Sequence, residues 1–196
     1  MSHAIRIIED EHRSLAAVLN GLCQVARQAR EGQAEPDRAL LHAMIDYIRE
    51  FPDRLHHPKE DEQLFRLLRR RAPELAPVLD RLGEEHLRGS ELLERVGSAL
   101  AGLEAGTAGL EELDRAIQAY AELEWSHMRT EEREVLPAAQ RALTPADWSS
   151  IDAAFRSNAD PLSGVDPVRE LRELFRRITA LAPAPIGVGP PGRKGG

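Results

Sequence analysis

The chain has 196 residues and a formal net charge of −7, and 30% of its residues are charged while only 4% are aromatic. This length suits one domain with a hydrophobic core, and the abundance of Leu, Ala, Arg and Glu favours helices over sheets. Because acidic and basic residues are interspersed and the balance is acidic, the sequence argues against nucleic acid as the main partner.

The sequence also indicates a cytoplasmic protein. Cys23 is the single cysteine, so no internal disulfide can form, which fits a reducing compartment. The first ten residues lack the apolar segment of a signal peptide, and no apolar run is long enough to span a membrane. We therefore expect no membrane association.

Hydrophobic periodicity predicts an all-α protein, an up-down antiparallel four-helix bundle with additional short C-terminal helices. The long helices are expected from Ser2 to about Glu31, from Pro36 to about Arg71, from about Leu79 to a Gly-rich loop at 105–109, and from Leu110 to about Pro137. Pro52 and Pro58 each remove a helical hydrogen bond, so we expect the second helix to be long and bent. A break at Pro58 is the alternative.

A short helix should follow, capped by Thr144 with Pro145 in its first position and extending through Phe155. A last helix is expected from Asp166 to about Leu181. The predicted organisation is a bundle over residues 1–161, a helical extension over 162–182 and a disordered Pro/Gly-rich tail over 183–196.

Each long helix carries histidine on its apolar face. His12 lies within the stripe of the first helix, His86 replaces an expected leucine in the third, and His127 lies on the seam of the fourth. His56 and Glu60 are four residues apart on the second helix, and His127 and Glu131 repeat this spacing, which places each pair on one helical face.

These residues should lie in one layer. Short connections make consecutive helices antiparallel neighbours, and at about 1.5 Å per residue the histidines of all four helices lie at similar heights. The layer collects His12, His56, Glu60, His86, His127 and Glu131. Such a set exceeds one tetrahedral zinc site and suits two metal ions bridged by carboxylates, iron or manganese being favoured over zinc.

Other polar residues near this layer have open roles. Glu124 either supports a ligating histidine or extends its carboxylate to solvent, and Tyr120 is expected in the core. We place His3 and His42 at the surface or in packing, and Cys23 as a small buried apolar side chain.

The segments around these histidines resemble the hemerythrin-like family of HHE cation-binding domains. They are Glu9-Asp10-Glu11-His12, His56-His57-Pro58-Lys59-Glu60-Asp61-Glu62-Gln63-Leu64-Phe65, Glu84-Glu85-His86 and the stretch from His127 to Pro137, within a similarity running from about Ala4 to Pro161. The resemblance implies a non-heme di-iron site in which the four histidines are terminal ligands and Glu60 and Glu131 are bridges.

The chain departs from oxygen-carrying hemerythrins at two positions. Ser90 stands where those proteins have a second histidine in the third helix, and Glu131 stands one residue before their aspartate, with Glu132 as its rival. His57 is the candidate replacement for the missing histidine, provided that Pro58 distorts the backbone there.

A missing ligand would leave an open position on one iron, which favours sensing or reactive chemistry over oxygen transport. We therefore expect O₂, NO or peroxide as the small ligand. An iron store or donor, and a regulatory module whose fold depends on metal, are the alternatives. Whether the protein is an enzyme, and which protein partner it has, stay undecided.

Overall fold

The computed structural model describes residues 2–156, 176 and 178, and within these residues it contains helices and no strand. The all-α class is therefore confirmed. The predicted helical extension and tail lie outside the described residues, apart from Arg176 and Ile178.

The first long helix, α1, spans His3–Arg30 and is capped by Ser2, whose hydroxyl accepts a hydrogen bond from the amide of Ala4. The second helical run contains α2 (Arg38–Ile48), η1 (Arg49–His56), α3 (His57–Lys59), η2 (Glu60–Phe65) and α4 (Arg66–Arg71). This run is continuous, so the alternative of a break at Pro58 is wrong. Its η1 and η2 segments are π-helical, a feature that the sequence analysis did not predict.

A 3₁₀ turn, η3 (Pro73–Leu75), leads into α5 (Ala76–Ala105). Gly106 ends α5 in the left-handed conformation with φ of 71°. A third π-helical segment, η4 (Glu131–Val135), joins α6 (Leu110–Thr130) to α7 (Leu136–Ala142). The helical run therefore continues through Pro137. The last described helix, α8, spans Pro145–Arg156.

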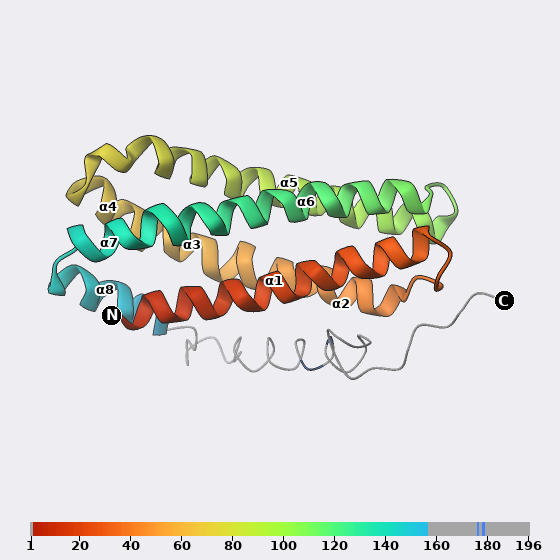
Figure 1. Ribbon diagram of the computed structural model, residues 1–196, viewed down its shortest axis with the longest axis horizontal. Coiled ribbons are helices and arrows are strands. Elements are labelled where there is room, and N and C mark those ends of the chain that lie inside the picture. Colours follow the sequence, from red (N-terminus) through yellow and green to blue (C-terminus); the bar gives the residue numbers. More distant parts are fainter. Residues whose placement is uncertain (1, 157–175, 177, 179–196) are drawn as a thin grey trace.

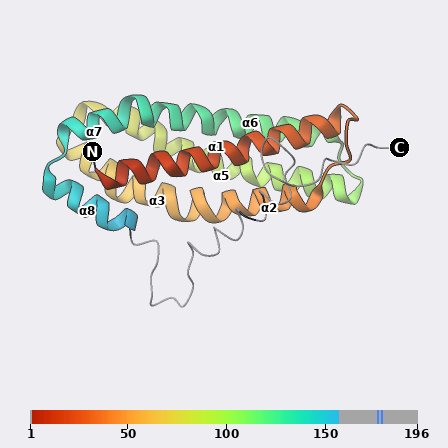
Figure 2. The ribbon, with the colours of Figure 1, turned by 60° about the horizontal axis from the view of Figure 1, so that its bottom comes forward.

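The long helices lie side by side along one axis (Figure 1). The chain runs out along α1, returns through α2 to α4, runs out again along α5 and returns through α6 and α7 (Figure 1). Figure 2 shows α1 between α6 on one side and the α2–α3 run on the other. α8 packs across one end of this arrangement, near the start of α1.

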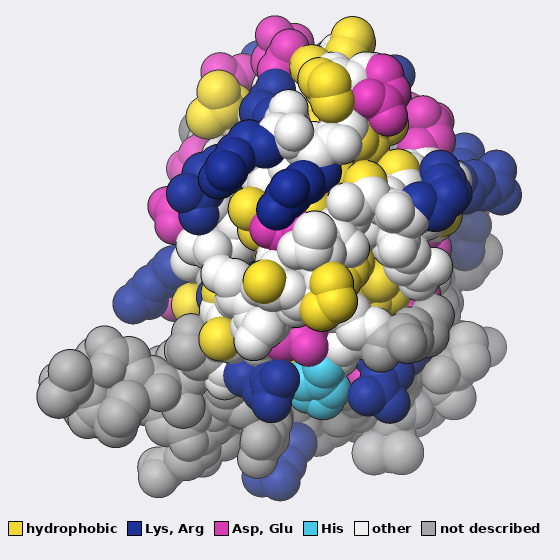
Figure 3. Space-filling model, turned by 90° about the vertical axis from the view of Figure 1, so that its left-hand side faces the viewer, with side chains coloured by type: hydrophobic (Ala, Val, Ile, Leu, Met, Phe, Trp, Pro, Cys, Tyr) yellow, Lys and Arg dark blue, Asp and Glu magenta, His cyan; other side chains and the backbone are white. Residues whose placement is uncertain are grey.

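Asp147 holds α8 against the second helical run. The guanidinium of Arg71 donates hydrogen bonds to both carboxylate oxygens of Asp147, and the amide and hydroxyl of Thr144 donate to one of them. These interactions keep the pKa of Asp147 below its usual range. Figure 3 shows this end of the molecule, where acidic, basic and apolar side chains are mixed.

The buried apolar side chains form two clusters rather than one. The first includes Leu15, Leu19 and Met44 and follows the α2 half of the molecule. The second includes Ile8, Phe65 and Leu82 and follows the α8 half. His12 lies between Ile8 and Leu15, so a layer of buried polar side chains separates the two clusters. Burying polar side chains costs folding free energy unless they bind one another or a ligand, so this layer is the candidate functional site.

Candidate metal centre

The polar layer contains two overlapping groups of side chains that could hold a metal ion. One group is His57, Glu60, His86 and His127, and the other is His12, His56, Glu60 and Glu131. Within each group, one donor atom per residue lies within 4.8 Å of all the others, and all seven residues are buried. The structure thus brings together every residue that the sequence analysis placed in the site.

Glu60 belongs to both groups, and its two carboxylate oxygens face different histidines. Its Oε1 lies 3.1 Å from Nε2 of His56, while its Oε2 lies 3.6 Å from Nε2 of His86. Glu131 is arranged in the same way, with Oε2 3.2 Å from Nε2 of His12 and Oε1 3.5 Å from Nε2 of His127. Each carboxylate therefore spans the two groups.

Acidic side chains behind the histidines orient the imidazoles. Four of them lie within hydrogen-bonding distance of an Nδ1 atom: Glu132 with His12 at 3.0 Å, Glu11 with His56 at 2.7 Å, Asp61 with His86 at 3.0 Å and Glu85 with His127 at 3.1 Å. Because an ionised carboxylate only accepts hydrogen bonds, each Nδ1 is the donor, which leaves the lone pair of the neutral ring on Nε2. Asp53 lies 3.7 Å from Nδ1 of His57.

This outer ring of acids was not identified from the sequence, except for Glu132, which was considered as a rival ligand. The structure places Glu132 behind His12 and in neither group. A usable signal was present, since Glu11, Asp61, Glu85 and Glu132 each stand next to a candidate ligand in the sequence. Histidine ligands commonly donate their second ring N–H to a carboxylate in this way.

Most of the nitrogen and oxygen atoms that face the middle of the layer have no hydrogen-bond partner among the described residues. Such atoms indicate whether the residues fit a metal ion. Among the described residues, no hydrogen bond satisfies Nε2 of His12 or any carboxylate oxygen of Glu60 and Glu131. Nε2 of His86 and Nε2 of His127 lie 3.1 Å apart, and in the neutral tautomer both are acceptors. Several convergent acceptors need protons or a cation between them, so the donor set fits metal ions.

The pKa values of the histidines depend on whether their neighbours are carboxylates or other imidazoles. Burial alone would lower the pKa of His12, but the neighbouring carboxylates of Glu131 and Glu132 raise it to about 8. Burial is likewise outweighed at His56, where the carboxylates of Glu60 and Glu11 raise the pKa to about 10. The pKa of His57 is lowered by burial and by the neighbouring histidines. Protons and metal ions thus compete for His12 and His56 near neutral pH.

The π-helical segments coincide with the site. η1 ends at His56, η2 begins at Glu60 and η4 begins at Glu131. The wider turn of a π segment changes the angle between successive side chains, and here both His56 and His57 are buried at the site. Imidazole stacking also holds His57, whose ring lies 4.1 Å from that of His86, centroid to centroid.

The structure also shows the burial of the polar residues whose roles the sequence left open. The side chain of Glu124 is 2% exposed, so the alternative of a solvent-directed carboxylate is wrong. Nδ1 of His127 faces Glu85 rather than Glu124. Tyr120 is buried. His42 is exposed and pairs with Glu104, and His3 is exposed near the start of α1.

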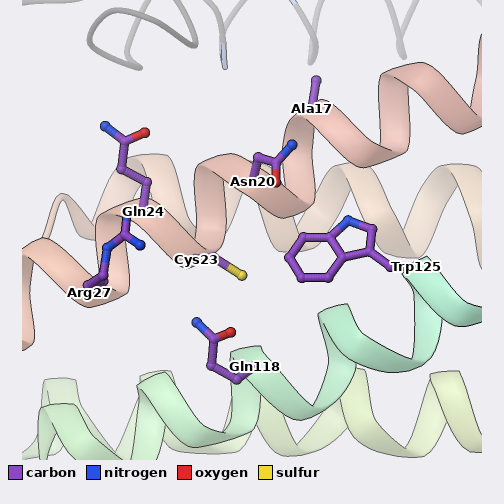
Figure 4. A pocket seen from close by; sticks show the side chains of 7 residues that line it. All are labelled: Ala17, Asn20, Cys23, Gln24, Arg27, Gln118 and Trp125. Carbon is purple, nitrogen blue, oxygen red and sulfur yellow. The ribbon is translucent and has the colours of Figure 1, made fainter.

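Cys23 is only partly buried, which corrects the expectation of a small buried apolar side chain, and it lines a hollow that includes no residue of the two metal groups. This cavity of about 590 Å³ lies between α1 and α6 (Figure 4) and is lined by Ala17, Asn20, Cys23, Gln24, Arg27, Gln118 and Trp125. Burial raises the pKa of the Cys23 thiol to about 11, so the thiol is protonated at neutral pH.

Within the described part of the chain, no helix combines the length and apolar character needed to cross a membrane. Comparison with protein families found one that covers the whole site: the model described as Hemerythrin HHE cation binding domain matches residues 3–139. Comparisons with curated proteins and with solved structures found no match.

Proposed function

The chain belongs to the hemerythrin HHE cation-binding family, and on that premise we propose that it is a di-iron protein that binds O₂, NO or peroxide in sensing or stress protection. The observation that carries the proposal is the position of Glu60 and Glu131, each with one oxygen toward either group of histidines. Bridging carboxylates between facing helices are typical of di-iron bundles. The proposed architecture is accordingly the up-down four-helix bundle.

Iron bound at the site would supply a redox-active pair able to bind a diatomic molecule or peroxide. The protein supplies unequal surroundings for the two ions. One group contains three imidazoles, His57, His86 and His127, whereas the other contains only His12 and His56. We propose that the group with two imidazoles leaves more room for a small ligand.

The surrounding residues perform the remaining tasks. The outer acids hold four of the five imidazoles in a fixed orientation through Nδ1, which reduces the reorganisation needed on binding. The two apolar clusters separate the layer from solvent along the long axis, which lowers the local dielectric and strengthens electrostatic interactions inside.

The first test is metal content per chain, measured on protein purified without added metal and without a nickel column. We expect about two irons per chain. Absorption spectra recorded after addition of O₂, NO or peroxide to the reduced protein would then identify the ligand. About one zinc per chain, or no metal after growth in iron-rich medium, would contradict the proposal.

Variants assign the bridging role to particular residues. Glu60→Ala and Glu131→Ala should each lower bound iron to below about half, because each carboxylate faces histidines of both groups. His42→Ala is the matched control, since His42 pairs with Glu104 at the surface. Full metal retention by both glutamate variants would refute the bridging assignment, and a loss in His42→Ala would mean that the site lies elsewhere.

Two other functions remain as alternatives to be separated by experiment. An iron store or donor would release its iron rapidly to a chelator. A regulatory module would show a large metal-dependent change in partner binding without turnover of O₂ or peroxide. The burial of all the inner donor atoms favours retention of the metal over its release.

A further inference from the structure

Glu124 is a buried acid without a role in the centre described above. Its side chain is 2% exposed, and its Oε2 has no hydrogen-bond partner among the described residues. Every other acid of the layer either lies in a metal group or sits beside an Nδ1 atom. Burial raises the pKa of Tyr120, which lies close enough to Glu124 for the charge of that carboxylate to raise it further. Because a buried carboxylate oxygen without a hydrogen-bond partner is costly, Glu124 requires an explanation.

The position of Glu124 on α6 directs it toward the centre. It precedes His127 by three residues, so the two side chains lie on the same helical face about one turn apart. In helical bundles that hold two metal ions, the Glu-x-x-His spacing projects both side chains into one site. Burial raises the pKa of Glu124 to about 7, which shows how little its present surroundings favour the charged form.

The carboxylate of Glu124 rests at a place that exists only because residue 89 is glycine. A Cβ atom at Gly89 would lie 2.9 Å from Oε1 of Glu124, closer than real Cβ contacts. Gly89 itself follows His86 by three residues on α5. Glu124 is thus held beside α5, about one turn along the bundle from the histidines, and outside both metal groups.

We infer that Glu124 is a reserve ligand, which leaves its place beside Gly89 and coordinates the metal held by His57, His86 and His127. The inference rests on the proposed two-metal centre. Three imidazoles and one oxygen each from Glu60 and Glu131 provide five donors to that ion. Glu124 supplies the sixth, and small ligands are then confined to the ion held by His12 and His56.

Cobalt(II) is the probe, because it absorbs less strongly in the visible range when six-coordinate than when five-coordinate. The full chain, freed of metal and titrated with Co²⁺ under anaerobic conditions, is compared with Glu124→Gln. We expect the variant to keep two Co²⁺ ions, to absorb more strongly, and to bind its tighter ion about tenfold more weakly. Glu122→Gln is the matched control, since Glu122 is exposed on the same helix.

Gly89→Ala tests the same inference in the opposite direction. The added methyl group displaces Oε1 of Glu124 from α5 and favours the coordinating position, because the group it meets is the free end of a flexible side chain. The Co²⁺ protein should therefore keep its visible spectrum and bind its tighter ion more strongly. In the double variant Gly89→Ala/Glu124→Gln this gain in affinity should disappear.

Failure of the inference is distinguishable from failure of the proposed function. If Glu124→Gln binds two Co²⁺ ions with unchanged spectrum and affinity, Glu124 is not a ligand and the centre itself stands. If Glu124→Gln does not fold, an unchanged Co²⁺ affinity for Gly89→Ala overturns the inference. If the unmodified chain binds fewer than two ions, the proposed centre is wrong.

Discussion

At the scale of single residues, the site depends on pairs of histidine and acid rather than on the histidines alone. His127 shows this most clearly, since its Nδ1 faces Glu85 on α5 while its Nε2 faces Glu131 on its own helical run. The outer acid fixes which nitrogen is free for the metal. A variant of the outer acid should therefore weaken metal binding without removing a ligand.

Glu85→Gln tests this role. The amide cannot accept the Nδ1–H of His127 with the strength of a carboxylate, so metal affinity should fall by about 10-fold to 100-fold. Competition with a chromogenic chelator measures the affinity. Glu84→Gln is the control, because Glu84 is exposed next to Glu85 and is not part of the layer. Equal affinities for the two variants would rule out an orienting role for Glu85.

At the scale of helical elements, capping residues determine where the helices begin. Three segments, η1, η2 and η4, depart from α-helical geometry at the site. Ser2 and Thr144 begin helices as the sequence analysis expected, and Asp37 caps α2 one residue after the expected start at Pro36. The π-helical segments instead occur where ligands must be aimed, at His56, Glu60 and Glu131. Ordinary α-helical spacing alone therefore does not describe the ligand-bearing turns.

Two glycines, Gly83 inside α5 and Gly106 at its C-terminal cap, provide a stability test at this scale. Gly106 has φ of 71°, which an alanine adopts only with strain, so Gly106→Ala should lower the free energy of unfolding by about 1 kcal/mol. Gly83 lies within α5, where a Cβ would meet Asp61 Oδ1 at an ordinary 3.8 Å. Gly83→Ala should raise the free energy of unfolding by about 0.5–1 kcal/mol. Urea denaturation measures both, and equal effects would contradict the assignment of Gly106 as the cap.

At the scale of the whole molecule, the polar layer joins all the long helical runs between two apolar clusters. His12 comes from α1, His56, His57 and Glu60 from the second run, His86 from α5, and His127 from α6. Ions bound in this layer would tie these runs together. Stability and metal content should therefore change together.

Metal binding should raise the thermal midpoint of unfolding. At a free metal concentration of about 100 times the dissociation constant, binding adds about 2.7 kcal/mol, or about 5–11 °C for a chain of this size. Differential scanning calorimetry of the metal-free and iron-loaded protein measures the change. The increment should vanish in Glu60→Ala, and an equal increment there would show that the stabilising metal binds outside this layer.

Metal affinity should increase with pH. The pKa values of His12 and His56 are raised to about 8 and about 10, so both imidazoles are protonated in the metal-free protein at pH 7. Binding displaces these protons, and the association constant should rise by about tenfold per pH unit for each proton released. Chelator competition at pH 6.5 and 7.5 measures this rise. An affinity that falls with increasing pH would mean that these histidines are not ligands.

Local sequence was sufficient to predict the helical class, several helix starts and the histidines and glutamates of the two metal groups. Helical periodicity and capping chemistry act over a few residues, so His12, His86 and Thr144 could be assigned from their neighbours. The family resemblance was likewise present in short segments, and the family match over residues 3–139 confirms it.

Only the tertiary structure decided which atoms face one another. The pairing of Glu85 with His127, the π-helical turns and the place of Glu124 beside Gly89 each join or distort segments in ways that spacing does not encode. The physical reason is that hydrogen bonding and close packing between helices depend on small rotations of each helix about its axis and small shifts along it. Sequence periodicity identifies the buried face of each helix, whereas packing of that face selects the contacts.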